Sequence, residues 1–123
     1  MGDFMKERLK NLLEGQLKEA FLELKNGSMV HLVINDELYK VAKINAKIML
    51  MPPSENDKPL LIFKINKDII SSIEEAKEDI KDVLRKLYLR GDIHVNVSAP
   101  TSILLACGAT SMLRKMGLTS PRR

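Results

Sequence analysis

The chain of 123 residues has a single cysteine, Cys107, and no tryptophan. One cysteine cannot form a disulfide within the chain, and it cannot build a cysteine-based metal site alone. Aromatic residues make up only 4% of the sequence, and the predicted strands lack the paired aromatic side chains that stack on nucleic-acid bases. We therefore expect no internal disulfide, no metal site and no nucleic-acid partner.

Signatures of catalysis and of cofactor binding are also missing. The sequence contains no phosphate-binding, dinucleotide-binding, serine-hydrolase or zinc-protease motif. His31 and His94 fall on predicted strands without a second ligand at metal-binding spacing. Cys107 falls in an apolar segment, where burial disfavours the reactive thiolate. We therefore expect a protein that is not an enzyme and needs no cofactor.

Excess positive charge is confined to the end of the chain. Four of the 20 lysines and arginines follow Leu113, and the other 16 balance the 16 acidic residues. We interpret residues 1–117 as a single domain and residues 118–123 as a short basic tail. The four basic residues are either a contact for an anionic membrane surface or a solvated helix end that complements the helix dipole. They are Arg114, Lys115, Arg122 and Arg123.

Long hydrophobic runs of the kind that target or anchor a protein are lacking too. The first residues lead straight into charged positions without the apolar segment of a secretory signal, so we expect a cytoplasmic protein. From Val95 to Leu113 the chain carries no charge, but polar residues and Pro100 interrupt this stretch, so it is too short to span a bilayer. The abundance of Lys, Glu and Ile suits a heat-adapted organism.

Two segments, about residues 3–25 and 68–91, show the spacing of amphipathic helices, with apolar residues at steps of three and four. A third helix, largely without charge, is predicted over about residues 100–116, with Pro100 at its start. Asp68 or the pair Ser71–Ser72 is the expected N-cap of the second helix. Each helix is predicted to be continuous.

Strand patterns occupy the remaining sequence. Residues 29–51 read as three strands with tight turns, the first of them at Asn35-Asp36, and Pro52-Pro53 ends the run. The segment LLIFKIN is a fourth strand, and DIHVNV alternates strictly as a fifth. The order is α-β-β-β-β-α-β-α. We predict an α+β fold in which an antiparallel five-stranded sheet carries three helices packed mainly on one face.

More apolar surface is present than one helix-covered face can absorb. The last predicted helix is apolar around most of its circumference, and such a helix must be covered on all sides or line an apolar space. The segment IMLM likewise places apolar side chains on both faces of its strand. Two explanations remain open. The free sheet face forms a dimer interface, or a cavity between the last helix and the sheet holds a hydrophobic ligand.

The segments LLIFKINKDIISSI and LRGDIHVNVSAPTSILLACGATSMLRKM resemble the sterol carrier protein-2 family, as does the order of the elements. The resemblance implies non-enzymatic binding or transfer of a lipid, fatty acid or acyl-CoA in an apolar tunnel beneath the last helix. The alternative is a dimeric protein-interaction module that uses the apolar sheet face and binds no ligand. Carried over to this sequence, the tunnel lining comprises Leu61, Phe63, Ile93, Val95, Ile103, Leu104, Ala106, Cys107 and Met112.

Overall fold

The computed structural model describes residues 2–118. In this range the chain forms six helices and five strands. The helices are α1 (Gly2–Glu14), α2 (Lys18–Phe21), α3 (Lys67–Glu75), α4 (Ile80–Leu89), α5 (Thr101–Ala106) and α6 (Ala109–Lys115). The strands are β1 (Met29–Ile34), β2 (Glu37–Ile44), β3 (Lys47–Met51), β4 (Leu61–Ile65) and β5 (His94–Val97). The predicted α+β class is confirmed.

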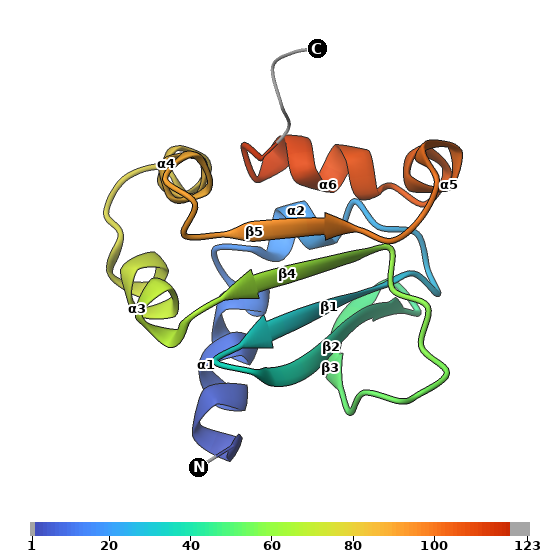
Figure 1. Cartoon of the computed structure of the whole chain (residues 1–123), viewed down its shortest axis with the longest axis horizontal. Coiled ribbons are helices and arrows are strands. Elements are labelled where there is room, and N and C mark those ends of the chain that lie inside the picture. The colour runs from blue at the N-terminus through green and yellow to red at the C-terminus, as the bar shows by residue number, and fades with distance from the viewer. Residues whose placement is uncertain (1, 119–123) are drawn as a thin grey trace.

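The five strands form one mixed sheet in the spatial order β3-β2-β1-β4-β5 (Figure 1). The central pair, β1 and β4, is parallel, with Leu32 beside Phe63, so the prediction of an antiparallel sheet was wrong at its centre. The connection explains this. β3 runs in the same direction as β1, and residues 52–60 return the chain to the end of the sheet where β1 starts. There the N–H of Leu60 donates to the carbonyl of Met29 (2.9 Å).

Each of the three predicted helices is divided in two, so the prediction of three continuous helices was wrong. The breaks fall at residues 15–17, 76–79 and 107–108. At the third break Gly108 adopts a left-handed conformation with φ 82°, which glycine reaches without steric cost. At the second, the carboxylate of Asp79 accepts the N–H of Lys81 (3.1 Å) and starts α4. Hydrophobic spacing continues across such breaks because both halves keep the same face toward the core.

Several local signals were read correctly. Asn35 and Asp36 have positive φ values, 50° and 69°, in the turn between β1 and β2. Gly91 (φ 86°) follows α4 as predicted. The N-cap of α3 differs from the prediction, because the side chain of Asn66, not that of Asp68 or Ser71–Ser72, accepts the N–H of Ile69 (3.2 Å). An amide oxygen is as effective a cap as a carboxylate.

A single hydrophobic core lies between the helices and one face of the sheet. Figure 1 shows α6 above the β5 edge, α3 and α4 beside one end of the strands, and α1 and α2 behind the sheet. Leu118 is buried in this core, so the packed part of the domain reaches beyond residue 117. The predicted tail from residue 119 onward lies outside the described residues. The largest fully buried side chains include Leu9, Phe21, Leu24, Ile34, Leu61, Ile70, Leu84 and Met112.

The loop of residues 52–60 covers part of the opposite face of the sheet. The carboxylate of Asp57 accepts hydrogen bonds from Nζ of Lys40 (2.8 Å) and from the N–H of Ser54 (2.8 Å), and it lies 3.2 Å from Nε2 of His31. His31 and Ala42 are buried on this face. We expected both faces of the sheet to need cover, and this loop supplies part of it.

Candidate functional site

An apolar cavity lies between the helices and the sheet. Its volume is about 40 Å³, and every residue that lines it is apolar. The lining comes from α1, α2, α3 and α4, from β1 and β4, and from residues that flank α2, α6 and β5. The most deeply buried of these residues are Leu9, Leu12, Phe21, Ile70 and Leu84.

The cavity is small for a ligand. Small-molecule sites in proteins commonly enclose about 300–1,000 Å³, whereas this space of about 40 Å³ is closer to the room that a single water molecule needs. A hydrocarbon chain would therefore have to displace side chains to enter. The described conformation leaves no room for a hydrocarbon chain.

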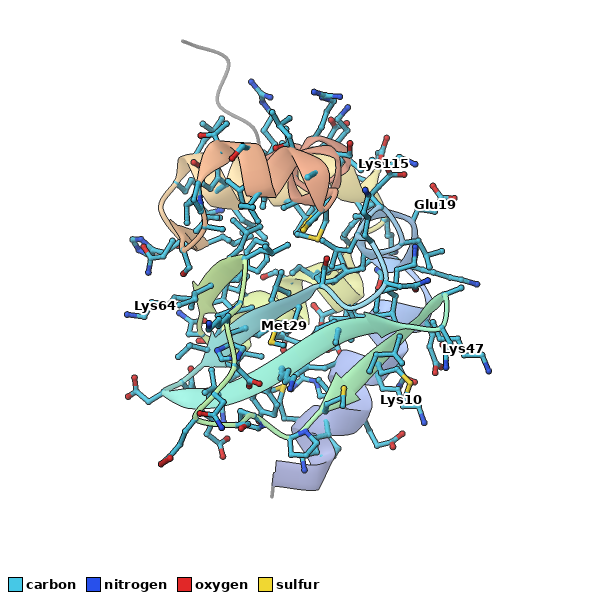
Figure 2. The ribbon with its side chains drawn as sticks, turned by 90° about the vertical axis from the view of Figure 1, so that its right-hand side faces the viewer. Lys10, Glu19, Met29, Lys47, Lys64 and Lys115 are labelled. Atoms are coloured by element: carbon cyan, nitrogen blue, oxygen red, sulfur yellow. The ribbon has the colours of Figure 1, made fainter. Side chains whose placement is uncertain are left out.

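A surface cleft of about 350 Å³ adjoins the cavity. It lies between the α1–α2 turn, the start of α4 and the end of α6, and three residues, Leu17, Leu84 and Met116, line both the cleft and the cavity. The rest of the cleft is more polar. Figure 2 shows two of its charged residues, Glu19 and Lys115, at the same corner of the molecule.

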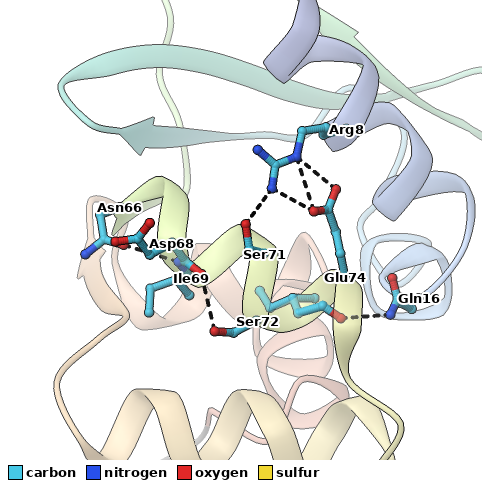
Figure 3. A network of polar contacts seen from close by, with 9 residues as sticks. Arg8, Gln16, Asn66, Asp68, Ile69, Ser71, Ser72 and Glu74 are labelled. Atoms are coloured by element: carbon cyan, nitrogen blue, oxygen red, sulfur yellow. Dashed lines mark hydrogen bonds and ion pairs between the residues drawn. The ribbon is translucent and has the colours of Figure 1, made fainter.

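A polar network holds α3 against α1 on another side of the cavity (Figure 3). The guanidinium of Arg8 donates to the carboxylate of Glu74 through Nη2 (2.7 Å) and Nε (3.0 Å), and Nη2 also donates to Oγ of Ser71 (2.9 Å). Nε2 of Gln16 donates to the carbonyl of Ile73 (2.9 Å). The hydrogen bond from Arg8 lowers the pKa of Glu74 below its usual value, so this carboxylate stays charged.

Four of the nine residues predicted to line a tunnel belong to the sheet side. Phe63 and Ile93 line the cavity. Leu61 is buried in the core but does not line the cavity, and Val95 is partly buried against the core.

The other five belong to the last predicted helix, and the structure spreads them over different environments. Leu104 and Met112 are buried, Cys107 is partly buried against the core, and Ile103 and Ala106 are exposed on α5. None of the five lines the cavity. A role of these nine residues in ligand binding stays a prediction.

The sequence reasoning did not select the cavity residues of the first two helical segments. Leu9 and Leu12 on α1, Ile70 and Ile73 on α3, and Leu84 on α4 all line it. Their apolar spacing was visible in the sequence, but periodicity shows only that a face is buried. Whether that face packs against other side chains or lines a cavity depends on how the helices assemble.

Within residues 2–118, no three His, Cys, Asp or Glu side chains come close enough together to hold a metal ion. Over the same range, none of the helices has both the length and the apolar character that crossing a bilayer requires.

Comparison with known proteins places the fold. No protein-family model matches the chain, and no curated protein matches it. A solved structure described as "UbiJ-SCP2 Ubiquinone synthesis protein" is similar, with a TM-score of 0.57 over 92% of this chain and 96% of that one. The chain has a sterol carrier protein-2-like fold. At 11% sequence identity this likeness concerns the fold alone, and it confirms the resemblance first noted in the segments around β4 and β5.

Proposed function

We propose that this sterol carrier protein-2-like domain binds a hydrophobic ligand, such as a lipid, a fatty acid or an acyl-CoA, and catalyses no reaction on it. One observation carries the proposal. A cavity lined only by apolar side chains lies directly beneath a surface cleft, and the two share Leu17, Leu84 and Met116. The fold supports the proposal, because its resemblance to the sterol carrier protein-2 family implies a lipid ligand.

Burial of the hydrocarbon would supply the binding free energy, at about 25 cal/mol per Å² of apolar surface removed from water. The small volume of the cavity opposes this gain, because side chains packed at native density must shift to admit the hydrocarbon chain. Met116 suits such a shift because its unbranched thioether adapts to irregular apolar partners. We propose Phe63 and Ile93, together with the apolar residues of α1 and α3, as the main ligand contacts.

The basic residues around the end of α6 would assist delivery. Arg114 is exposed, and Lys115 lines the cleft. We propose that these two residues contact an anionic membrane surface while the ligand is transferred. Arg122 and Arg123, predicted for the same role, lie outside the described residues.

The test begins with mass spectrometry of the freshly purified protein under native conditions and after extraction with organic solvent. We expect a bound lipid or acyl species, or uptake of added fatty acid by ligand-free protein. Two substitutions on one strand then locate the site. Ile65 lines the cavity, whereas Ile62 has the same intermediate exposure on the other face of β4. Ile65→Phe should reduce uptake, and Ile62→Phe should not. Equal uptake by both variants, or no uptake by the wild-type protein, would contradict the proposal.

A second candidate function uses the sheet face that the loop of residues 52–60 leaves open. Leu38 is 41% exposed and Met49 is 42% exposed, and both lie on this face, where β3 is an edge strand. This supports the alternative of a homodimer or a protein-interaction module. Sedimentation equilibrium would detect the dimer, and Met49→Lys should convert it to a monomer. A wild-type protein that is monomeric at high concentration would argue against this alternative.

A further inference from the structure

We infer that Leu17, Leu84 and Met116 form a gate, and that movement of α4 opens it to admit the hydrocarbon chain of a single-chain amphiphile. This inference rests on the proposed function and adds the route, the moving element and the class of ligand. These three residues alone line both the cleft and the cavity, so a chain that moves from one space to the other must pass between them.

Two of the three helix breaks meet at this gate. The α1–α2 turn contributes Gly15, Gln16 and Leu17 to the cleft, and the start of α4 contributes residues 79–81. Main-chain breaks at these points leave short helical segments that can move with respect to each other at low cost, unlike the two halves of one continuous helix. The gate therefore lies where the helical layer is segmented.

Polar contacts hold some of the helices around the gate more firmly than others. Ties to the remainder of the domain hold α3 and α6, since Arg8 and Gln16 bind α3, and Lys115 of α6 pairs with Glu23 (3.1 Å). By contrast, within residues 2–118 no hydrogen bond or ion pair joins α4 to α1, α2 or α6. Apolar packing holds α4, through Val83, Leu84 and Leu87. Among the described residues, α4 shares this lack of polar ties with the four-residue α2, and it is the longer of the two helices.

Irregular segments border α4 at both ends. Residues 76–79 form the linker from α3, and Ala76 there is extended (φ −65°, ψ 133°). Gly91 follows the helix with φ 86° and has open space where a side chain would be. Such residues can absorb changes in backbone angles when the element between them rotates. The ion pair between Lys86 of α4 and Glu78 of the linker has both side chains more than half exposed, so it restrains the helix weakly.

The chemistry of the two spaces points to an amphiphile. The cavity offers no polar partner, so a buried polar head group there would lose its hydrogen bonds to water without replacement. The cleft is lined by the side chains of Gln16, Glu19, Asp79, Lys81 and Lys115, and it can keep a polar head solvated and hydrogen-bonded. A ligand with one hydrocarbon chain fits this arrangement better than a ligand with two. The cavity measures only about 40 Å³, so a second hydrocarbon chain would have to displace still more side chains.

The test measures how fast the chain enters and leaves. cis-Parinaric acid, a fluorescent fatty acid with one chain, serves as the probe in stopped-flow binding and release. Met116→Ala removes one side of the gate. Met112→Ala is its control, because Met112, one turn earlier on α6, is also buried but lines neither the cavity nor the cleft. We expect Met116→Ala to raise the rates of both association and dissociation at least about tenfold, and Met112→Ala to change them less than about twofold.

A second pair covers the case in which Met116→Ala does not fold. Leu17→Ala removes the opposite side of the gate at a partly exposed position, and Leu22→Ala, also partly exposed and outside both spaces, is its control. Equal rates for gate and control variants that still bind the probe would overturn the gate and leave the proposed function standing. A wild-type protein that does not bind the probe would overturn both.

Discussion

The carboxylate of Asp57 accepts a 2.8 Å hydrogen bond from Nζ of Lys40 on the face of the sheet opposite the hydrophobic core. The two residues belong to different segments, the loop of residues 52–60 and strand β2, which lies next to the edge strand β3. The side chain of Asp57 is only 6% exposed, so water has little access to this hydrogen bond. Asp57 therefore holds the loop on the sheet more firmly than a solvent-exposed carboxylate would.

This arrangement predicts a dependence of stability on pH. The hydrogen bond from Lys40, with those from the N–H of Ser54 and from His31, lowers the pKa of Asp57 to about 2. Because this value lies below that of a free side chain, 3.8, the stabilisation is complete above about pH 4 and is lost as the pH falls toward 2. Urea unfolding followed by circular dichroism should show this loss. Asp57→Asn should be less stable near neutral pH and show a shallower acid slope, so a slope equal to that of the wild type would contradict the assignment.

Substitutions at two glycines can separate the stability cost of a left-handed backbone conformation from the cost of a steric clash. Gly27 and Gly108 both have positive φ, 90° and 82°, but a Cβ at Gly27 would meet nothing, whereas one at Gly108 would overlap the carbonyl oxygen of Glu23. Gly27→Ala should cost about 1 kcal/mol for the left-handed conformation. Gly108→Ala adds a clash with backbone, and we expect a total loss of about 3 kcal/mol or more. Urea unfolding of both variants measures the difference, and equal losses would show that Gly108 has room to adjust.

Much of this fold could be predicted because its signals are local. Asn35-Asp36 specifies a turn whichever strands it joins, and Gly91 ends a helix wherever that helix packs. The parallel pairing of β1 with β4 is not local, since it depends on how residues 52–60 cross the sheet. The same limit applies to the cavity. Leu12 and Ile73 have ordinary core spacing, and only the assembled layers bring them to one space.

Consecutive residues of α5 test which side of this helix belongs to the core. Leu104 is 9% exposed and Leu105 is 60% exposed. Leu104→Ser should lower the free energy of unfolding by about 2–5 kcal/mol, because it removes buried methyl groups and buries a hydroxyl. Leu105→Ser should change it by less than about 0.5 kcal/mol. Thermal unfolding of the two variants would decide, and a large loss for Leu105→Ser would show that its side chain is covered in solution.

The pair Arg8–Glu74 offers a direct measure of the bond between α1 and α3. The side chains are 20% and 31% exposed, and the contact uses two guanidinium nitrogens. A double-mutant cycle with Arg8→Met and Glu74→Gln should give a coupling free energy of about 1 kcal/mol at low salt. The coupling should shrink as salt is added, since partly exposed charges are screened. A coupling that is zero at every salt concentration would mean that the pair does not hold α3 in place.

The position of β1 in the middle of the sheet has a consequence for synthesis on the ribosome. One neighbour, β2, follows after the turn Asn35-Asp36, but the other, β4, is Leu61–Ile65. Until those residues emerge from the exit tunnel, the growing chain carries β1, β2 and β3 with the inner edge of β1 unpaired. Exposed edges of this kind pair readily with other chains. The first half of this protein thus depends for its solubility on the prompt arrival of the second, or on a chaperone that covers the edge meanwhile.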